Sequence, residues 1–137
     1  MYTYHFQFSI TGADGSAASP TPALDPPPGS GNISSRLLSG KVQSIYVKYN
    51  TQPNTTDVVV KTNGQNGPSQ TLLTLTNKNT DGLFYLRTAA ADVLGAAVTF
   101  DGTHAQLVPP AIDDYVVVTV AQGNAGTIDV WLMVETC

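Results

Sequence analysis

The side chains that most often carry out acid–base chemistry are few in this sequence, and their spacing does not bring them together. The two histidines, His5 and His104, stand in alternating stretches at positions that an extended strand turns toward its polar face. Asp113 and Asp114 are adjacent, so a strand sends them to opposite sides, whereas paired-carboxylate catalysis needs both on one side. The GxSxG sequence that marks many serine nucleophiles is absent. We therefore predict that the protein is not an enzyme, and that it has no catalytic residues and no bound cofactor.

The segment NKNTDG comes nearest to a metal-binding motif. Asn77, Asn79 and Asp81, with a glycine after them, reproduce the first half of a calcium-binding loop. That motif requires a glutamate at its twelfth position, where this chain has Thr88. Because the segment supplies a single carboxylate, we interpret it as a glycine-assisted turn and predict no metal site.

The composition describes one small domain with a polar but weakly charged surface. The chain has 137 residues, of which 12% are charged, and its net charge is −4. A chain of this length buries roughly two-thirds of its unfolded surface when it folds as one domain. Only six residues are lysine or arginine, and they are widely spaced, so no basic stripe exists to neutralise phosphates. We predict no nucleic-acid partner.

The sequence lacks the usual marks of secreted and membrane proteins. Cys137 is the only cysteine, which excludes an intrachain disulfide and a thiolate metal cluster. No run of about 18 apolar residues marks a membrane span, and the start of the chain has neither the basic region nor the apolar run of a signal peptide. We expect a protein that is made in the cytoplasm and has no membrane partner.

The opening stretch YTYHFQFSIT alternates apolar and polar residues with the period of a strand. Its apolar positions are Tyr2, Tyr4, Phe6, Phe8 and Ile10. Burying five such side chains is worth about 8 to 15 kcal/mol, which rivals the net stability of a whole domain. We predict that these five residues form a protein interface.

A Pro-, Gly- and Ser-rich stretch follows and sets the domain organisation. We predict a strand at residues 1–11, an extended arm at residues 12–32 and one β domain at residues 33–137. Extended Pro-rich chain rises about 3.1 Å per residue, so the arm could span roughly 65 Å. The opening strand therefore completes a sheet of its own domain or of a neighbouring subunit, and the reach of the arm favours the neighbour.

From Ile33 onward, short apolar runs alternate with turn signals at a spacing typical of all-β domains. The candidate strands are Val42–Tyr49, Asp57–Thr62, Gln70–Thr76, Leu83–Arg87, Ala97–Phe100, Thr103–Val108, Tyr115–Gln122 and Thr127–Glu135. The best helical candidate, Thr88–Leu94, is very short. The pattern predicts an all-β, single-domain β-sandwich or jelly-roll-like barrel with an extended N-terminal strand and arm.

Two hairpins are predicted inside this domain. Asp101-Gly102 between alternating runs is typical of a type I′ turn. The register that follows pairs Thr99 with His104 and gathers one apolar face, which consists of Val98, Phe100, Ala105 and Leu107. The second hairpin turns at Gly123–Gly126 and presents two inner rows, which are Val116, Val118 and Val120 on one strand and Ile128, Val130, Leu132 and Val134 on the other.

The opposite face of the last strand carries Trp131 and Met133 between two carboxylates, Asp129 and Glu135. An apolar patch rimmed by charge suits a protein contact. We therefore add Trp131 and Met133 to the predicted protein interface. A strand that is buried on both faces is the alternative interpretation.

Four stretches of the chain together resemble small virion proteins of tailed bacteriophages: SGKVQSIYVKYNTQPNTTDVVVKT, SQTLLTLTNKNTDGLFYLRT, VTFDGTHAQL and GNAGTIDVWLMVE. Such proteins include capsid decoration, or cement, proteins, which are β-sandwich or jelly-roll modules that sit as homotrimers on the shell. The resemblance implies a structural protein on the capsid surface of a virion, whose partners are its own copies and the phage major capsid protein. It covers about Ser39 to Glu135 and leaves out the opening strand and arm.

A second class of function remains open. A carbohydrate-binding module of a tail or head-fibre adhesin would use exposed aromatic side chains as sugar platforms, and Trp131, Tyr46 and Tyr85 are the candidates.

Overall fold

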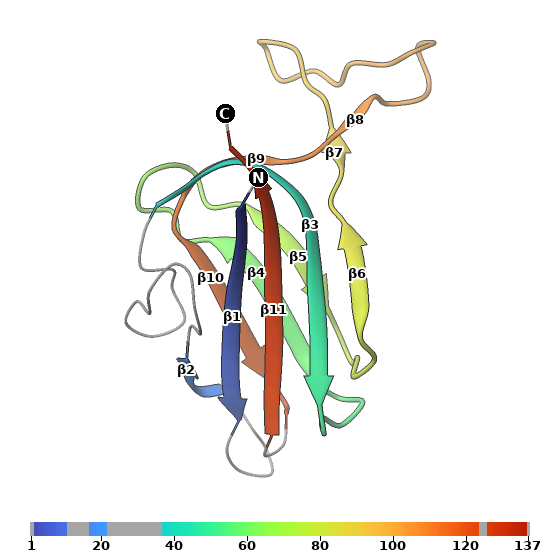
Figure 1. Cartoon of the computed structure of the whole chain (residues 1–137). Coiled ribbons are helices and arrows are strands. Elements are labelled where there is room, and N and C mark those ends of the chain that lie inside the picture. The colour runs from blue at the N-terminus through green and yellow to red at the C-terminus, as the bar shows by residue number, and fades with distance from the viewer. Residues whose placement is uncertain (1, 11–16, 22–36, 124–125, 137) are drawn as a thin grey trace.

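The computed structural model describes residues 2–10, 17–21, 37–123 and 126–136, and over these residues the protein is all-β (Figure 1). The strands are β1 Tyr2–Ile10, β2 Ala17–Thr21, β3 Leu38–Asn50, β4 Asp57–Thr62, β5 Thr71–Leu75, β6 Gly82–Tyr85, β7 Thr88–Ala89, β8 Leu107–Val108, β9 Ala111–Asp114, β10 Val116–Ala121 and β11 Gly126–Glu135. These described segments contain no helix. The predicted all-β class is confirmed.

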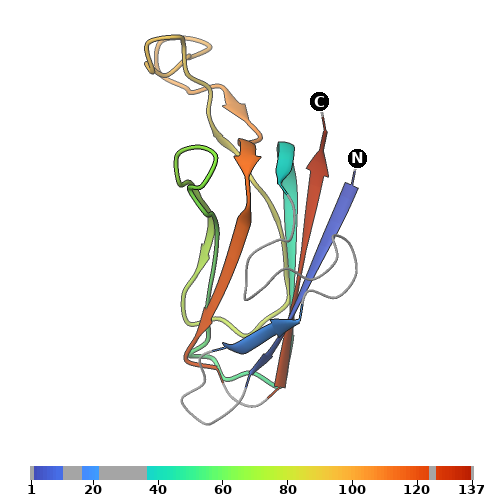
Figure 2. The same cartoon turned by 90° about the vertical axis from the view of Figure 1, so that its left-hand side faces the viewer.

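The strands form two sheets that pack face to face and a small two-stranded ribbon (Figures 1 and 2). The larger sheet has the order β2-β1-β11-β3-β6, and β9 also pairs with the start of β3. The smaller sheet has the order β10-β4-β5, and β7 pairs with β8. All of these strand pairs are antiparallel.

The core lies between the two sheets because each is apolar on the side that faces the other. Alternate residues of β11, from Ile128 to Val134, are fully buried. Alternate valines of the smaller sheet, among them Val60 in β4 and Val118 in β10, are buried in the same cluster. Branched aliphatic side chains pack well on a pleated surface, so these residues favour strands and also supply the core.

The opening strand β1 pairs with β11 of its own chain. The register runs from Tyr2 opposite Val134 to Ile10 opposite Gly126. The sequence had favoured docking on a neighbouring subunit, and the structure differs because the edge of β11 that faces away from β3 is open within the same chain. Docking there needs no second molecule and so avoids the entropic cost of association. The side chains of Tyr2, Tyr4, Phe6, Phe8 and Ile10 lie outside what the structure describes.

Part of the predicted arm is a strand. Residues Ala17–Thr21 form β2, which pairs with β1 from Gln7 to Ile10. The rest of the predicted arm, residues 12–16 and 22–32, lies outside the described residues.

The predicted hairpin between β10 and β11 is wrong. β10 pairs with β4 in the smaller sheet, whereas β11 pairs with β1 and β3 in the larger one. The inner rows of β10 and β11 were correctly placed in the core, but they belong to opposite sheets. An alternating strand requires only that its apolar face be buried, and this pattern does not tell whether two such strands lie side by side in one sheet or in two sheets that face each other.

The segment after β6 also differs from its prediction. Thr88–Ala89 begins no helix but forms β7, and of the candidate strand Thr103–Val108 only Leu107–Val108 is a strand. The candidate strand Ala97–Phe100 is reduced to isolated bridges, one of which pairs Thr99 with Ala105 instead of His104. The predicted register is therefore wrong by one residue, and its apolar face is not buried, since Phe100 and Leu107 are exposed.

Candidate functional site

The outer face of the larger sheet brings aromatic and apolar side chains together in two cross-strand rows. The first row follows the register from His5 to Trp131 to Tyr46 and ends at Leu83 of β6. The second row consists of Thr3, Met133, Ser44 and Tyr85. Side chains of paired residues project from the same face, so these rows form one continuous surface, which we call the outer face.

Trp131 lies at the centre of the outer face, in contact with aromatic rings from both neighbouring strands. The His5 ring stacks on it with ring centroids 4.4 Å apart and an interplanar angle of 4°, and the Tyr46 ring lies tilted at 5.3 Å. The Nε2–H of His5 donates a hydrogen bond to Oδ1 of Asp129 at 2.9 Å. The amide of Asn50 donates to Oδ2 of the same carboxylate at 3.2 Å. These contacts fix the indole ring and leave it half-buried, so Trp131 is neither fully exposed nor enclosed on both sides.

Around Trp131, the outer face exposes apolar side chains. Met133 is 39% exposed, and Leu83 and Tyr85 on β6 are exposed further still. The structure thus places Trp131 and Met133 on one surface and adds His5, which the sequence had assigned only to a polar face. That this surface is a protein interface stays a prediction. Of the other predicted interface residues, Tyr2, Tyr4, Phe6, Phe8 and Ile10, only the backbone pairing described above is known.

A second surface is the projecting arm, residues 88–108, which extends beyond the ends of both sheets (Figures 1 and 2). Two apolar side chains at one of its turns are almost fully exposed, with Val93 97% and Leu94 90% exposed, whereas Phe100, 72% exposed, precedes the other turn. We call Val93 and Leu94 the arm tip. A contiguous exposed apolar patch is typical of a protein interaction site.

The backbone of the projecting arm, residues 88–108, is nevertheless well hydrogen-bonded. The N–H groups of Ala90 and Gln106 donate across the arm at 2.8 and 2.9 Å. Oδ1 of Asp92 accepts the N–H groups of Leu94 and Ala96 at 2.8 and 3.0 Å, which closes the loop that carries Val93. The arm tip is therefore presented by a defined backbone.

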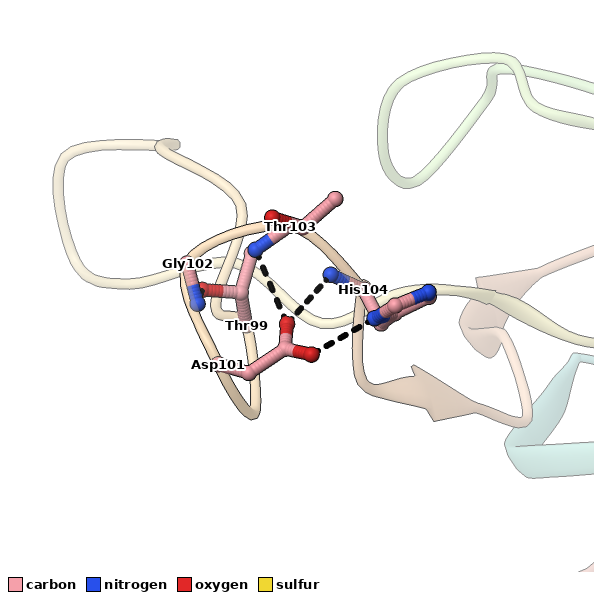
Figure 3. Close-up of polar contacts among 5 residues, drawn as sticks. All are labelled: Thr99, Asp101, Gly102, Thr103 and His104. Carbon is pink, nitrogen blue, oxygen red and sulfur yellow. Dashed lines mark hydrogen bonds and ion pairs between the residues drawn. The ribbon is translucent and has the colours of Figure 1, made fainter.

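Asp101 organises the other turn of the arm (Figure 3). Its Oδ1 accepts the N–H groups of Thr103 and His104 at 2.9 and 2.8 Å, and the ring Nδ1–H of His104 donates to Oδ2 at 2.6 Å. The bonds from the backbone and ring of His104, and then from the backbone of Thr103, lower the pKa of Asp101. Because the Asp101 side chain accepts these N–H groups, the predicted type I′ turn does not form, and the pairing of the two flanking segments shifts by one residue.

Asp114 is a buried carboxylate that anchors a turn. It accepts N–H groups of Gly64 at 2.6 Å, Tyr115 at 2.8 Å and Asn66 at 3.2 Å. Burial alone would raise the pKa of Asp114, but the backbone donors together outweigh it and hold the pKa below its usual value. Asp113 is exposed on the other side of the strand, so the two adjacent carboxylates do not act as a pair.

The side chains of the NKNTDG segment point to separate partners. Asp81 accepts the N–H of Tyr49 at 2.8 Å, and Asn79 donates to the carbonyl of Gln52 at 3.0 Å. Within the described ranges, no cluster of three or more His, Cys, Asp or Glu side chains is placed to hold a metal ion. The segment is the turn that leads from β5 to β6.

Sequence reasoning missed the parts of both surfaces that depend on distant contacts. His5 lies next to Trp131 only because β1 and β11 pair, and Leu83 and Tyr85 join the outer face only through β3. The exposed pair Val93 and Leu94 had a signal in the sequence, because two apolar residues stand between Asp92 and Gly95, which are both typical turn residues.

Comparisons of the chain with protein-family models, with curated proteins and with solved structures found no match. None of the described segments forms a helix of the length and hydropathy that crossing a bilayer requires.

Proposed function

We propose that this chain is a structural protein of a tailed-bacteriophage virion, and specifically a capsid decoration protein that binds the assembled shell as a homotrimer and stabilises it. In this proposal the protein is made in the host cytoplasm, resides on the capsid surface and catalyses no reaction. Its partners are its own copies and the major capsid protein.

The observation that carries the proposal is apolar surface that the fold holds in place but leaves uncovered. The arm tip is presented on a hydrogen-bonded backbone, and Met133, Leu83 and Tyr85 are exposed on the outer face. Burying one such side chain is worth roughly 1.5 to 3 kcal/mol, so either surface could supply much of the free energy of a protein contact. A protein that works by lattice contacts needs such surfaces.

The architecture supports the same proposal. Two facing antiparallel sheets with one core between them support classing the domain as a β-sandwich, the finer fold expected from the resemblance to decoration proteins. A jelly roll is a less suitable description, because the smaller sheet has three strands among the residues that the structure describes.

A carbohydrate-binding adhesin is less well supported. His5 already stacks on Trp131, and Tyr46 lies beside the same ring, so the indole is a poorer sugar platform than a free tryptophan. Tyr85 is 67% exposed but has no second free ring from its own row to lie against the same sugar.

Co-sedimentation with phage shells tests the proposal. We expect the protein to pellet with assembled shells of the phage that encodes it and to stay in solution with unassembled capsid subunits. Met133→Asp places a charge on the outer face and should weaken shell binding, whereas Thr74→Asp, at an exposed position on β5 of the opposite sheet, should not. Failure of the wild-type protein to bind any assembled shell would contradict the proposal.

A further inference from the structure

A groove opens along the side of the molecule where both sheets end. β6 is the last strand of the larger sheet and β5 the last of the smaller, so each pairs on one side only within the described part of the chain. Between them lies a groove of about 410 Å³ with a mixed lining, in which Leu72 and Leu73 of β5 and Phe84 of β6 supply apolar surface among polar side chains. A cavity of roughly 150 Å³ admits a benzene ring, so this groove has room for more than one apolar side chain.

The arm tip of the same chain does not fill this groove. Thr88 lines the groove and is also the first residue of β7, so the arm rises from the rim itself. Val93 and Leu94 nevertheless remain almost fully exposed, and the arm points away from the two sheets (Figures 1 and 2). Each copy therefore carries a partly apolar groove and uncovered apolar side chains that do not meet within one molecule.

The charges of the two surfaces are complementary. Arg87 is the one charged residue among those that line the groove. The arm carries Asp92 directly before its tip and contains no lysine or arginine between residues 88 and 108, whereas Asp101 lies at the other turn and is paired with His104. An acidic tip is attracted to a groove with a basic rim, and such pairing favours one docking orientation over others.

We propose that the arm tip of one copy of this chain occupies the β5–β6 groove of a second copy. Each copy offers one arm and one groove, so the assembly closes when every copy both gives and receives an arm, either as a reciprocal pair or as a larger ring. A ring of three copies is the homotrimer of the proposed function, and only this copy number rests on that proposal.

Light scattering coupled to size-exclusion chromatography tests the exchange. Leu94→Ser with Val93→Ser removes apolar surface at positions exposed in the monomer, so the fold should be retained, as circular dichroism would verify. We expect the association constant to fall roughly 100-fold or more, on the basis of about 10-fold or more for each lost side chain. The matched control Thr103→Ser, at an exposed polar position on the same arm, should associate like the wild-type protein.

A cysteine pair tests the partner directly. On a Cys137→Ser background, Leu94→Cys places a thiol on the arm tip, and Thr71→Cys places one at an exposed position that lines the groove. Under oxidation we expect a mixture of the two single variants to form covalent heterodimers joined between positions 94 and 71, whether the copies exchange arms in pairs or in a larger ring. Heterodimers no more abundant than the homodimers that each variant forms alone would overturn the proposal.

The outcomes also separate this inference from the proposed function. A wild-type protein that is monomeric at micromolar concentration but pellets with shells would overturn arm exchange and leave shell binding intact. A tip variant that stays oligomeric but no longer pellets would assign the arm tip to the shell, and would overturn exchange in the same way. A tip variant that loses both association and cooperative shell binding supports exchange.

Discussion

Replacing His5 with alanine should destabilise the protein by an amount that the structure allows us to estimate. The His5 ring stacks on Trp131 at 4.4 Å, and such pairs contribute about 0.5 to 1.5 kcal/mol beyond the area that they bury. His5 also donates to the buried carboxylate of Asp129, and a hydrogen bond to a charged group contributes about 1.5 to 3 kcal/mol. We expect the His5→Ala variant to lose about 2 to 4.5 kcal/mol of unfolding free energy.

Urea unfolding followed by tryptophan fluorescence measures this loss. Trp131 is the only tryptophan in the chain, so its emission reports directly on the contact that is removed. Thr3→Ala is the matched control, because Thr3 is exposed on the same strand and its loss should change the free energy by less than about 0.5 kcal/mol.

Two results would refute the reasoning behind this prediction. If His5→Ala unfolds at the same urea concentration as the wild-type protein, then β1 does not dock on β11 in the register described. If the size of the loss depends on protein concentration, then β1 docks on another subunit, as the reach of the predicted arm had suggested.

Three further changes test the core and its ionisable groups. Leu132→Ala should cost about 2 to 5 kcal/mol in urea unfolding, because this fully buried side chain leaves a cavity between the sheets; a smaller cost would contradict the described core. Tyr49→Phe should stabilise the protein by about 1 kcal/mol, because the buried Tyr49 hydroxyl has no hydrogen-bond partner among the described residues. Burial, reinforced by the charges of Asp81 and Asp57, raises the pKa of Tyr49 from 10.0 to about 12. The unfolded chain therefore loses this proton at a lower pH than the folded protein does, so the wild-type protein should lose stability as the pH rises from 10 to about 12. The phenylalanine variant should not show this loss. Asp114→Asn should lower the urea midpoint at neutral pH and make that midpoint depend less on pH in the acid range. The reason is that the lowered pKa of Asp114 contributes stability above pH 3.8, and this stability is lost as the pH falls through the folded-state pKa. A variant whose urea midpoint falls with acid as steeply as that of the wild-type protein would contradict the anchoring role.

The sequence predicted the bounds of a strand well where the strand is rich in apolar residues and has a clear turn on either side. The predicted bounds of β4, Asp57–Thr62, agree with the structure, and β11 differs by a single residue. In β11 the aliphatic residues at every second position identify the buried side without any knowledge of the partner strand, whereas the three consecutive valines of β4 indicate only a strand.

Partner choice could not be predicted in the same way. The inner rows of β10 and β11 fit one sheet or two facing sheets equally well, and only the structure assigns them to opposite sheets. The contact between His5 and Asp129 joins residues 124 positions apart, so no local pattern reveals it. In the arm, the carboxylate of Asp101 competes with the backbone for N–H groups, and this competition overrode the turn that Asp-Gly ordinarily favours.

The central claim of this account is that the surfaces left uncovered by the fold are covered by other protein when the molecule works. Cryo-electron microscopy of assembled phage shells with the protein bound tests this claim most directly. We predict density for the arm tip inside a neighbouring copy, and contact between the shell and the outer face around Met133. A bound molecule in which the arm tip and the outer face both project into solvent would contradict the claim.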